Sequence, residues 1–82
     1  MVYGEIEAGV KEILAKQLTM DTQKISLESR LVEDLGLDSF GSVEVAFELE
    51  EKFDLKIPDA ALYEAKTVKN IVDYIFSQKE GK

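Results

Sequence analysis

The segment from Ser39 to Phe53 carries the strongest helical pattern in the chain. When its residues are placed at about 100° per position, the apolar side chains share one broad arc. The members of this arc are Val43, Val45, Ala46, Leu49 and Phe53, followed at its edge by Phe47 and Phe40. The arc is wider than a surface helix needs. We therefore predict that one part faces a core and that the Phe40–Val43–Phe47 edge stays partly exposed.

Two other segments also repeat apolar residues at helical spacing. The first runs roughly from Gly4 to Leu18, and the second follows Thr67, which is expected to cap it. Pro58 cannot continue a helix, so it ends the segment that precedes it. A short helical turn, with Asp59 as its cap, is expected over residues 59–64.

A long loop from Thr19 to Asp38 separates the first two helices. Its regularly placed aliphatic residues are expected to hold it against the core, with a short turn over Leu31–Leu35 that ends at Gly36. No β-hairpin signal is present. The pattern therefore predicts an all-α fold, a small four-helix bundle of three longer helices and one short helix. We expect residues 1–82 to form a single domain, with about residues 78–82 frayed.

Charge is distributed very unevenly along the sequence. Residues 31–51 hold seven acids and no Lys or Arg, while the rest holds ten of the 17 acids and all ten bases. The net charge of −7 therefore arises in this quarter of the chain. Such a balance argues against nucleic acid as a partner and for partners that present Lys and Arg. The start has neither a signal-peptide pattern nor a membrane-spanning run.

The residue types limit the chemistry that the chain can perform. There is no Cys and no His, which excludes disulfides and the common zinc sites and fits a reducing, cytoplasmic compartment. A catalytic serine would lack its usual base, and the acids lie on a predicted solvated surface. Calcium-loop and phosphate-loop spacings are absent as well. We therefore expect no catalytic activity and no metal site.

Ser39 lies where the long loop becomes a helix, and two interpretations are open. Ser39 can be the N-cap of that helix, the commonest role of Ser at such a position. Alternatively, Asp38 is the cap and Ser39 is exposed, so that a phosphate attached to it would lie near the positive end of the helix dipole. No capping box decides between them, since Gly41 and Ser42 stand three residues on.

The residues Leu35–Phe40, with the sequence LGLDSF, resemble the Asp-Ser-Leu attachment signature of the acyl carrier protein family. The resemblance extends through VEVAFELEEKFDLKIPD and KTVKNIVDYI over nearly the whole chain. It implies a four-helix bundle without catalysis of its own. It also implies that Ser39 bears a 4′-phosphopantetheine arm from coenzyme A, whose thiol carries acyl groups as thioesters.

The resemblance further implies that the second helix recognises partner enzymes. The partners expected are phosphopantetheinyl transferase, acyl–acyl carrier protein synthetase or transferases, and ketoacyl synthases and related enzymes. The residues that would contact their basic patches are Asp38, Phe40, Val43, Glu44, Phe47, Glu48 and Glu51. Acyl chains would shelter between the helices, where the lining candidates are Phe40, Val43, Phe47, Leu62 and Ile71.

Some residues depart from the family pattern. Phe40 stands where Leu is usual, Gly41 stands where a polar residue is common, and the segment 59–66 has few acids. These departures favour a specialised carrier over the housekeeping one. A carrier of aminoacyl or polyketide units is one alternative to a fatty-acid carrier. The other is an unmodified helical subunit that binds partners and uses Ser39 only as a cap. In each case we expect a monomer.

Overall fold

The computed structural model describes residues 2–80. Within them the chain forms four α-helices and one 3₁₀ turn, in the order α1 (Tyr3–Leu18), η1 (Thr22–Lys24), α2 (Ser39–Phe53), α3 (Asp59–Glu64) and α4 (Val68–Glu80). No strand occurs in this part of the chain, which has only an isolated antiparallel bridge between Arg30 and Thr67. The predicted all-α fold of three longer helices and one short helix is confirmed.

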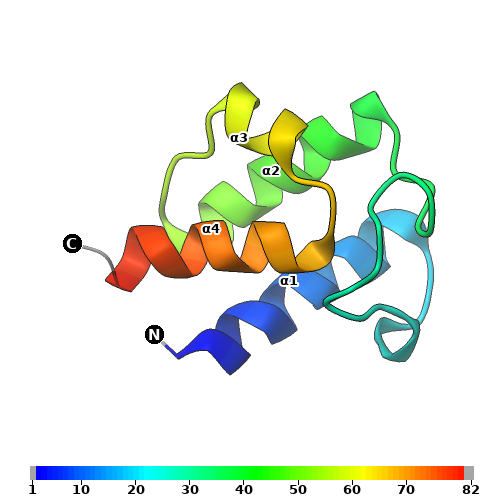
Figure 1. Cartoon of the computed structure of the whole chain (residues 1–82), viewed down its shortest axis with the longest axis horizontal. Helices are drawn as coiled ribbons and strands as arrows, with labels where there is room; N and C mark the ends of the chain where they lie inside the picture. Colours follow the sequence, from blue (N-terminus) through cyan, green and yellow to red (C-terminus); the bar gives the residue numbers. More distant parts are fainter. Residues whose placement is uncertain (1, 81–82) are drawn as a thin grey trace.

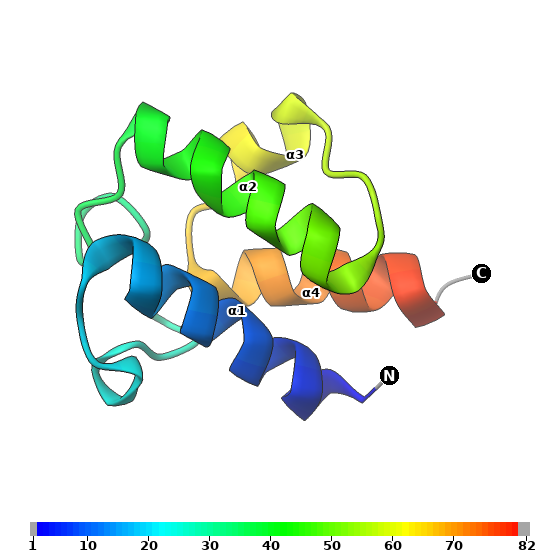
Figure 2. The ribbon, with the colours of Figure 1, turned by 180° about the vertical axis from the view of Figure 1, so that it is seen from behind.

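The helices α2 and α4 both run opposite to α1, and α3 lies at the outer edge of the bundle beside α2 (Figures 1 and 2). As a result α1 begins and α4 ends at one end of the molecule, while α2 begins at the other. The three long helices supply most of the core. Its largest fully buried side chains are Ile6, Val10, Leu14, Val45, Leu49, Val68, Val72 and Ile75.

The long loop before α2 is anchored both by its buried side chains, as predicted, and by backbone hydrogen bonds. Ile25, Leu31 and Leu37 are buried in the core. Its backbone is joined to the start of α4, because the Val68 amide donates to the Ser29 carbonyl at 3.1 Å. The turn after Leu31 ends at Gly36, whose φ of 73° is the left-handed conformation that glycine adopts at low cost. This anchoring fixes the place at which α2 begins.

Three element boundaries differ from the sequence-based expectation. The first helix starts at Tyr3, one residue earlier than expected. The cap position of α3 is occupied by Pro58, and Asp59 is already helical, so the expected cap was wrong by one residue. The last helix continues to Glu80, so it includes residues 78–80 of the tail that was expected to fray. The Lys79 ammonium donates to the Asp54 carbonyl at 3.3 Å and ties this last turn to the end of α2. Residues 81–82 lie outside the described residues.

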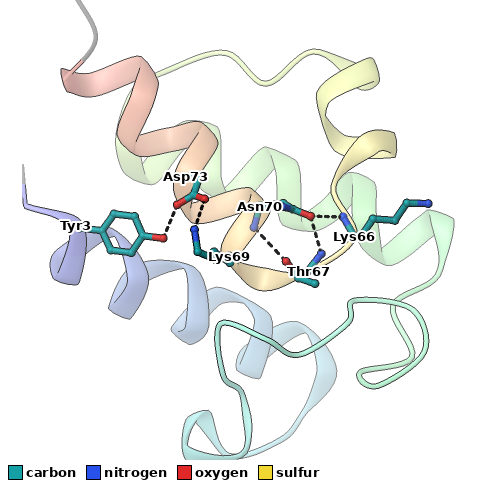
Figure 3. A network of polar contacts seen from close by, with 6 residues as sticks. All are labelled: Tyr3, Lys66, Thr67, Lys69, Asn70 and Asp73. Carbon is teal, nitrogen blue, oxygen red and sulfur yellow. Dashed lines mark hydrogen bonds and ion pairs between the residues drawn. The ribbon is translucent and has the colours of Figure 1, made fainter.

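The expected cap at the start of α4 is confirmed (Figure 3). The Asn70 amide donates to the Thr67 hydroxyl at 3.3 Å, and the Asn70 side-chain oxygen accepts from the Lys66 amide at 2.8 Å and from the Thr67 amide at 3.1 Å. The Asn70 side chain thus satisfies the two amides that precede α4, while the Asn70 amide donates to both the hydroxyl and the carbonyl of Thr67.

The first residue of α1 is joined to α4 by a polar contact, drawn in Figure 3, and by an aromatic contact. The Tyr3 hydroxyl donates to the Asp73 carboxylate, which also accepts from Lys69 at 2.7 Å. The Tyr3 ring packs edge-on against Phe76, with 5.3 Å between the ring centroids. The hydrogen bond to Asp73, with burial, raises the pKa of Tyr3 to about 12. The bonds from Lys69 and then Tyr3 lower the pKa of Asp73.

We expect Tyr3→Phe to keep the ring packing and to lower the free energy of unfolding by about 1 kcal/mol at neutral pH. Because the folded pKa of Tyr3 lies above its usual value of about 10, this contribution is present below about pH 10 and is lost as the pH rises towards 12. Urea unfolding of both proteins at pH 7 and about pH 11 measures it. The prediction fails if the difference between the two proteins is the same at both pH values.

Candidate functional site

The start of α2 resolves the two interpretations of Ser39. Asp38 has an extended backbone and is the N-cap, and its Oδ1 accepts from the Gly41 amide at 2.7 Å. Ser39 is therefore the first residue inside the helix, and it is exposed. Because the neighbouring carboxylate performs the capping, the Ser39 hydroxyl is not needed to stabilise the helix.

Gly41 contributes to this arrangement in a way that sequence reasoning missed. An added Cβ at Gly41 would lie 3.1 Å from Asp38 Oδ1 and 3.2 Å from Leu37 Cδ1, which is tighter than ordinary contact. By helix propensity alone, a glycine in the first helical turn costs up to about 1 kcal/mol relative to alanine. In the structure its missing side chain leaves room for the cap carboxylate above the buried Leu37. In the sequence, the only sign of this close contact was a glycine at the third position of the expected helix.

An exposed apolar strip runs along α2 from this cap. Phe40, Val43 and Phe47 are 73%, 52% and 66% exposed, although all three are large hydrophobic residues. On the opposite side of the same helix, Val45 and Leu49 are fully buried. The predicted division of the apolar arc into a core face and an exposed edge is therefore confirmed.

The acids of α2 fall into two groups. Glu44 and Glu51 are exposed, and Glu48 is half-buried, with its carboxylate 3.4 Å from the Lys16 ammonium of α1. At helical spacing these three lie next to the apolar strip. Glu50 points elsewhere, since its Oε2 accepts from the Ile57 amide at 2.8 Å. All the predicted contact residues thus lie on α2 or its cap, whereas the Glu50 carboxylate contacts the loop that follows the helix.

Two small cavities lie between α2 and the α3 region. The outer one, about 110 Å³, is lined by Val43, Ala46, Phe47, Glu50, Ile57 and Leu62. The inner one, about 20 Å³, is lined by Leu49, Ile57, Ala61, Leu62, Ala65, Asn70, Ile71 and Tyr74. Of the five candidates for an apolar lining, only Phe40 lies outside both, at the exposed start of the strip.

The described residues carry no cluster of three or more side chains suited to a metal ion. Across residues 2–80, no helix combines the length and apolar character that crossing a membrane requires.

Comparison with known proteins agrees with this site. The family model described as "phosphopantetheine attachment site" matches residues 8–75, and so covers the cap, Ser39 and all of α2. The chain thus matches a domain family defined by phosphopantetheine attachment, and the matched region includes the exposed serine at the start of α2.

Curated relatives define the family more closely. The acyl carrier protein of Campylobacter concisus is 41% identical over 73 residues, which cover 89% of this chain and 92% of that protein. The acyl carrier protein of Bdellovibrio bacteriovorus is 40% identical over 77 residues, or 94% of this chain and 96% of that protein. The acyl carrier protein of the Aster yellows witches'-broom phytoplasma is 47% identical over 66 residues, which cover 80% of this chain and 87% of that protein. The chain belongs to the acyl carrier protein family.

Proposed function

We propose that Ser39 carries 4′-phosphopantetheine and that the chain transports acyl groups between biosynthetic enzymes of fatty-acid or related synthesis. One observation supports this most directly: Asp38 caps α2, so the exposed Ser39 hydroxyl is available for modification. The chain itself then acts as a carrier and not as a catalyst. When bound, the arm supplies the thiol that holds acyl groups as thioesters. The chain has no Cys and so has no thiol of its own.

The residues around Ser39 fit such a group. The Ser39 oxygen would bond to the phosphorus of coenzyme A nearer the pantetheine, 3′,5′-ADP would leave, and the serine proton would pass to a base of the transferase. The resulting phosphodiester would lie beside the first-turn amides of α2, which have no acceptor within the helix. The positive end of the helix dipole favours negative charge at this place.

The test is to incubate the full chain with coenzyme A and a phosphopantetheinyl transferase. We expect one phosphopantetheine group per chain by intact mass, and fragmentation should locate it on residue 39. An unchanged mass, or a group located on Ser42 or Ser77, would overturn the proposal. An unchanged mass would also favour the alternative in which the chain is an unmodified helical subunit that binds partners.

The exposed face of α2 is proposed as the surface that partner enzymes recognise. Its acids Glu44, Glu48 and Glu51 offer a negative field to a basic patch, and Asp38 extends that field to the modified serine. The Phe40–Val43–Phe47 strip offers apolar area that a partner can cover. Steering by charge raises the rate of encounter while leaving the complex weak enough to dissociate.

We expect the double variant Glu44→Lys, Glu48→Lys to lower kcat/KM for modification by the transferase by at least about tenfold at low salt. The effect should shrink in about 1 M salt, where the screening length falls to about 3 Å. The fold should be nearly intact, since the Glu48–Lys16 pair is an exposed one worth at most about 1 kcal/mol.

The matched control is Glu28→Lys, Glu64→Lys, which changes the net charge equally at exposed positions outside α2. This control variant should keep most of the wild-type kcat/KM for modification by the transferase. Equal losses in the two double variants would show that overall charge, and not this surface, governs encounter.

The cavities beside α2 favour an acyl cargo over an aminoacyl one, because the inner cavity is lined almost wholly by apolar side chains. Such a lining shelters a hydrocarbon chain and would leave a charged amino group without partners. We propose further that residues 1–82 act as a single monomeric domain in the cytoplasm.

A further inference from the structure

Glu50 holds the loop between α2 and α3 at three successive points. Its carbonyl accepts from the amides of Asp54 and Leu55, the latter at 3.2 Å, as part of the helix end. Its carboxylate reaches further along the chain and accepts from the Ile57 amide at 2.8 Å. The side chain of one α2 residue therefore fixes Ile57 in place.

Ile57 is where the two cavities meet. Ile57 and Leu62 line both the outer cavity and the inner one, so these two side chains form the wall between them. The outer cavity, about 110 Å³, is several times the roughly 10–15 Å³ that one water-sized group needs, so it admits a short run of methylene groups. The inner cavity, about 20 Å³, has room for only about one such group while the wall stays in place.

We propose that the Glu50–Ile57 hydrogen bond is the latch that limits how long an acyl chain the protein can shelter. A short chain fits the outer cavity with the latch closed. A longer chain reaches the inner apolar cavity only when Ile57 moves, and that movement costs the bond to Glu50. Glu50 is thus a positioning residue for the cargo and not a member of the partner-binding surface. This inference rests on the proposed function, because it requires an acyl chain attached through Ser39.

The first test needs no cargo. In Glu50→Ala, hydrogen exchange of the Ile57 amide should be about tenfold faster, because a hydrogen bond to a charged group is lost. Glu50→Gln keeps an acceptor oxygen and should stay within about threefold of the wild type. The Leu55 amide is an internal reference, since it donates to the Glu50 backbone in every variant. Unchanged Ile57 exchange in Glu50→Ala would overturn the latch.

The second test uses the modified protein loaded with butanoyl or octanoyl groups. Cleavage of each thioester by hydroxylamine reports how well the cargo is shielded. In Glu50→Ala, moving Ile57 aside no longer breaks a hydrogen bond to residue 50. We therefore expect cleavage of the octanoyl thioester to become slower, relative to cleavage of the butanoyl thioester, by up to about tenfold. An unchanged ratio, or equal loss of shielding for both chains, would overturn the inference. A chain that accepts no arm at all would instead refute the proposed function.

Discussion

Ser39→Ala is expected to take up no phosphopantetheine under conditions that modify the wild-type chain completely. The substitution removes the only atom of residue 39 that can form the phosphodiester. Because Ser39 is exposed and Asp38 makes the cap contact, the free energy of unfolding should change by less than about 0.5 kcal/mol. Intact mass after incubation and urea unfolding measure the two quantities.

Ser42→Ala is the matched control, since Ser42 lies one turn further along α2. It should be modified as the wild type is. If Ser39→Ala instead cost about 1 kcal/mol or more, the serine and not Asp38 would be acting as the cap. Uptake of the arm by Ser39→Ala would show that another residue is the attachment point.

Gly9→Val is expected to lower the free energy of unfolding by about 3 kcal/mol, a large part of the roughly 4–12 kcal/mol typical of a domain this size. A Cβ at Gly9 would lie 2.7 Å from Phe53 Cζ and 2.8 Å from Lys52 Cε. The lysine can move away, but the Phe53 ring is only 3% exposed and is held by the core. The contact between α1 and α2 therefore has to widen.

Gly4→Ala in the same helix is the control. Apart from its chain neighbours and the adjacent backbone of its own helix, no heavy atom lies within 4 Å of a Cβ added at Gly4, so alanine should raise helix stability by up to about 1 kcal/mol. The two variants should shift the urea midpoint in opposite directions. A gain in stability for both would mean that Phe53 can move without cost to the core.

Helical periodicity was sufficient to predict much of the fold. It gave α2 its bounds of Ser39–Phe53 and separated the core face from the exposed Phe40–Val43–Phe47 edge. Residue chemistry was sufficient for the Thr67 cap and the turn that ends at Gly36. These features depend on neighbours within a few positions, and such neighbours can be found in the sequence.

Features that depend on distant or competing contacts were not predictable. Asp38 and Ser39 were equally acceptable caps by type, and only the direction of the Asp38 carboxylate decides between them. The Glu50 carboxylate was counted only among the seven acids of residues 31–51, and its bond to an amide seven residues further along the chain was not foreseen. Lys79, in the tail that was expected to fray, donates to the carbonyl of Asp54, which lies 25 positions earlier at the end of α2.

The start of α1 and the end of α4 share one end of the bundle, and α2 begins at the other (Figure 1). A fusion or an immobilising tag joined near either of those helix ends would therefore leave Ser39 facing away from it. Displayed on a bead or a scaffold in this way, each carrier would present its modifiable hydroxyl outward to enzymes in solution.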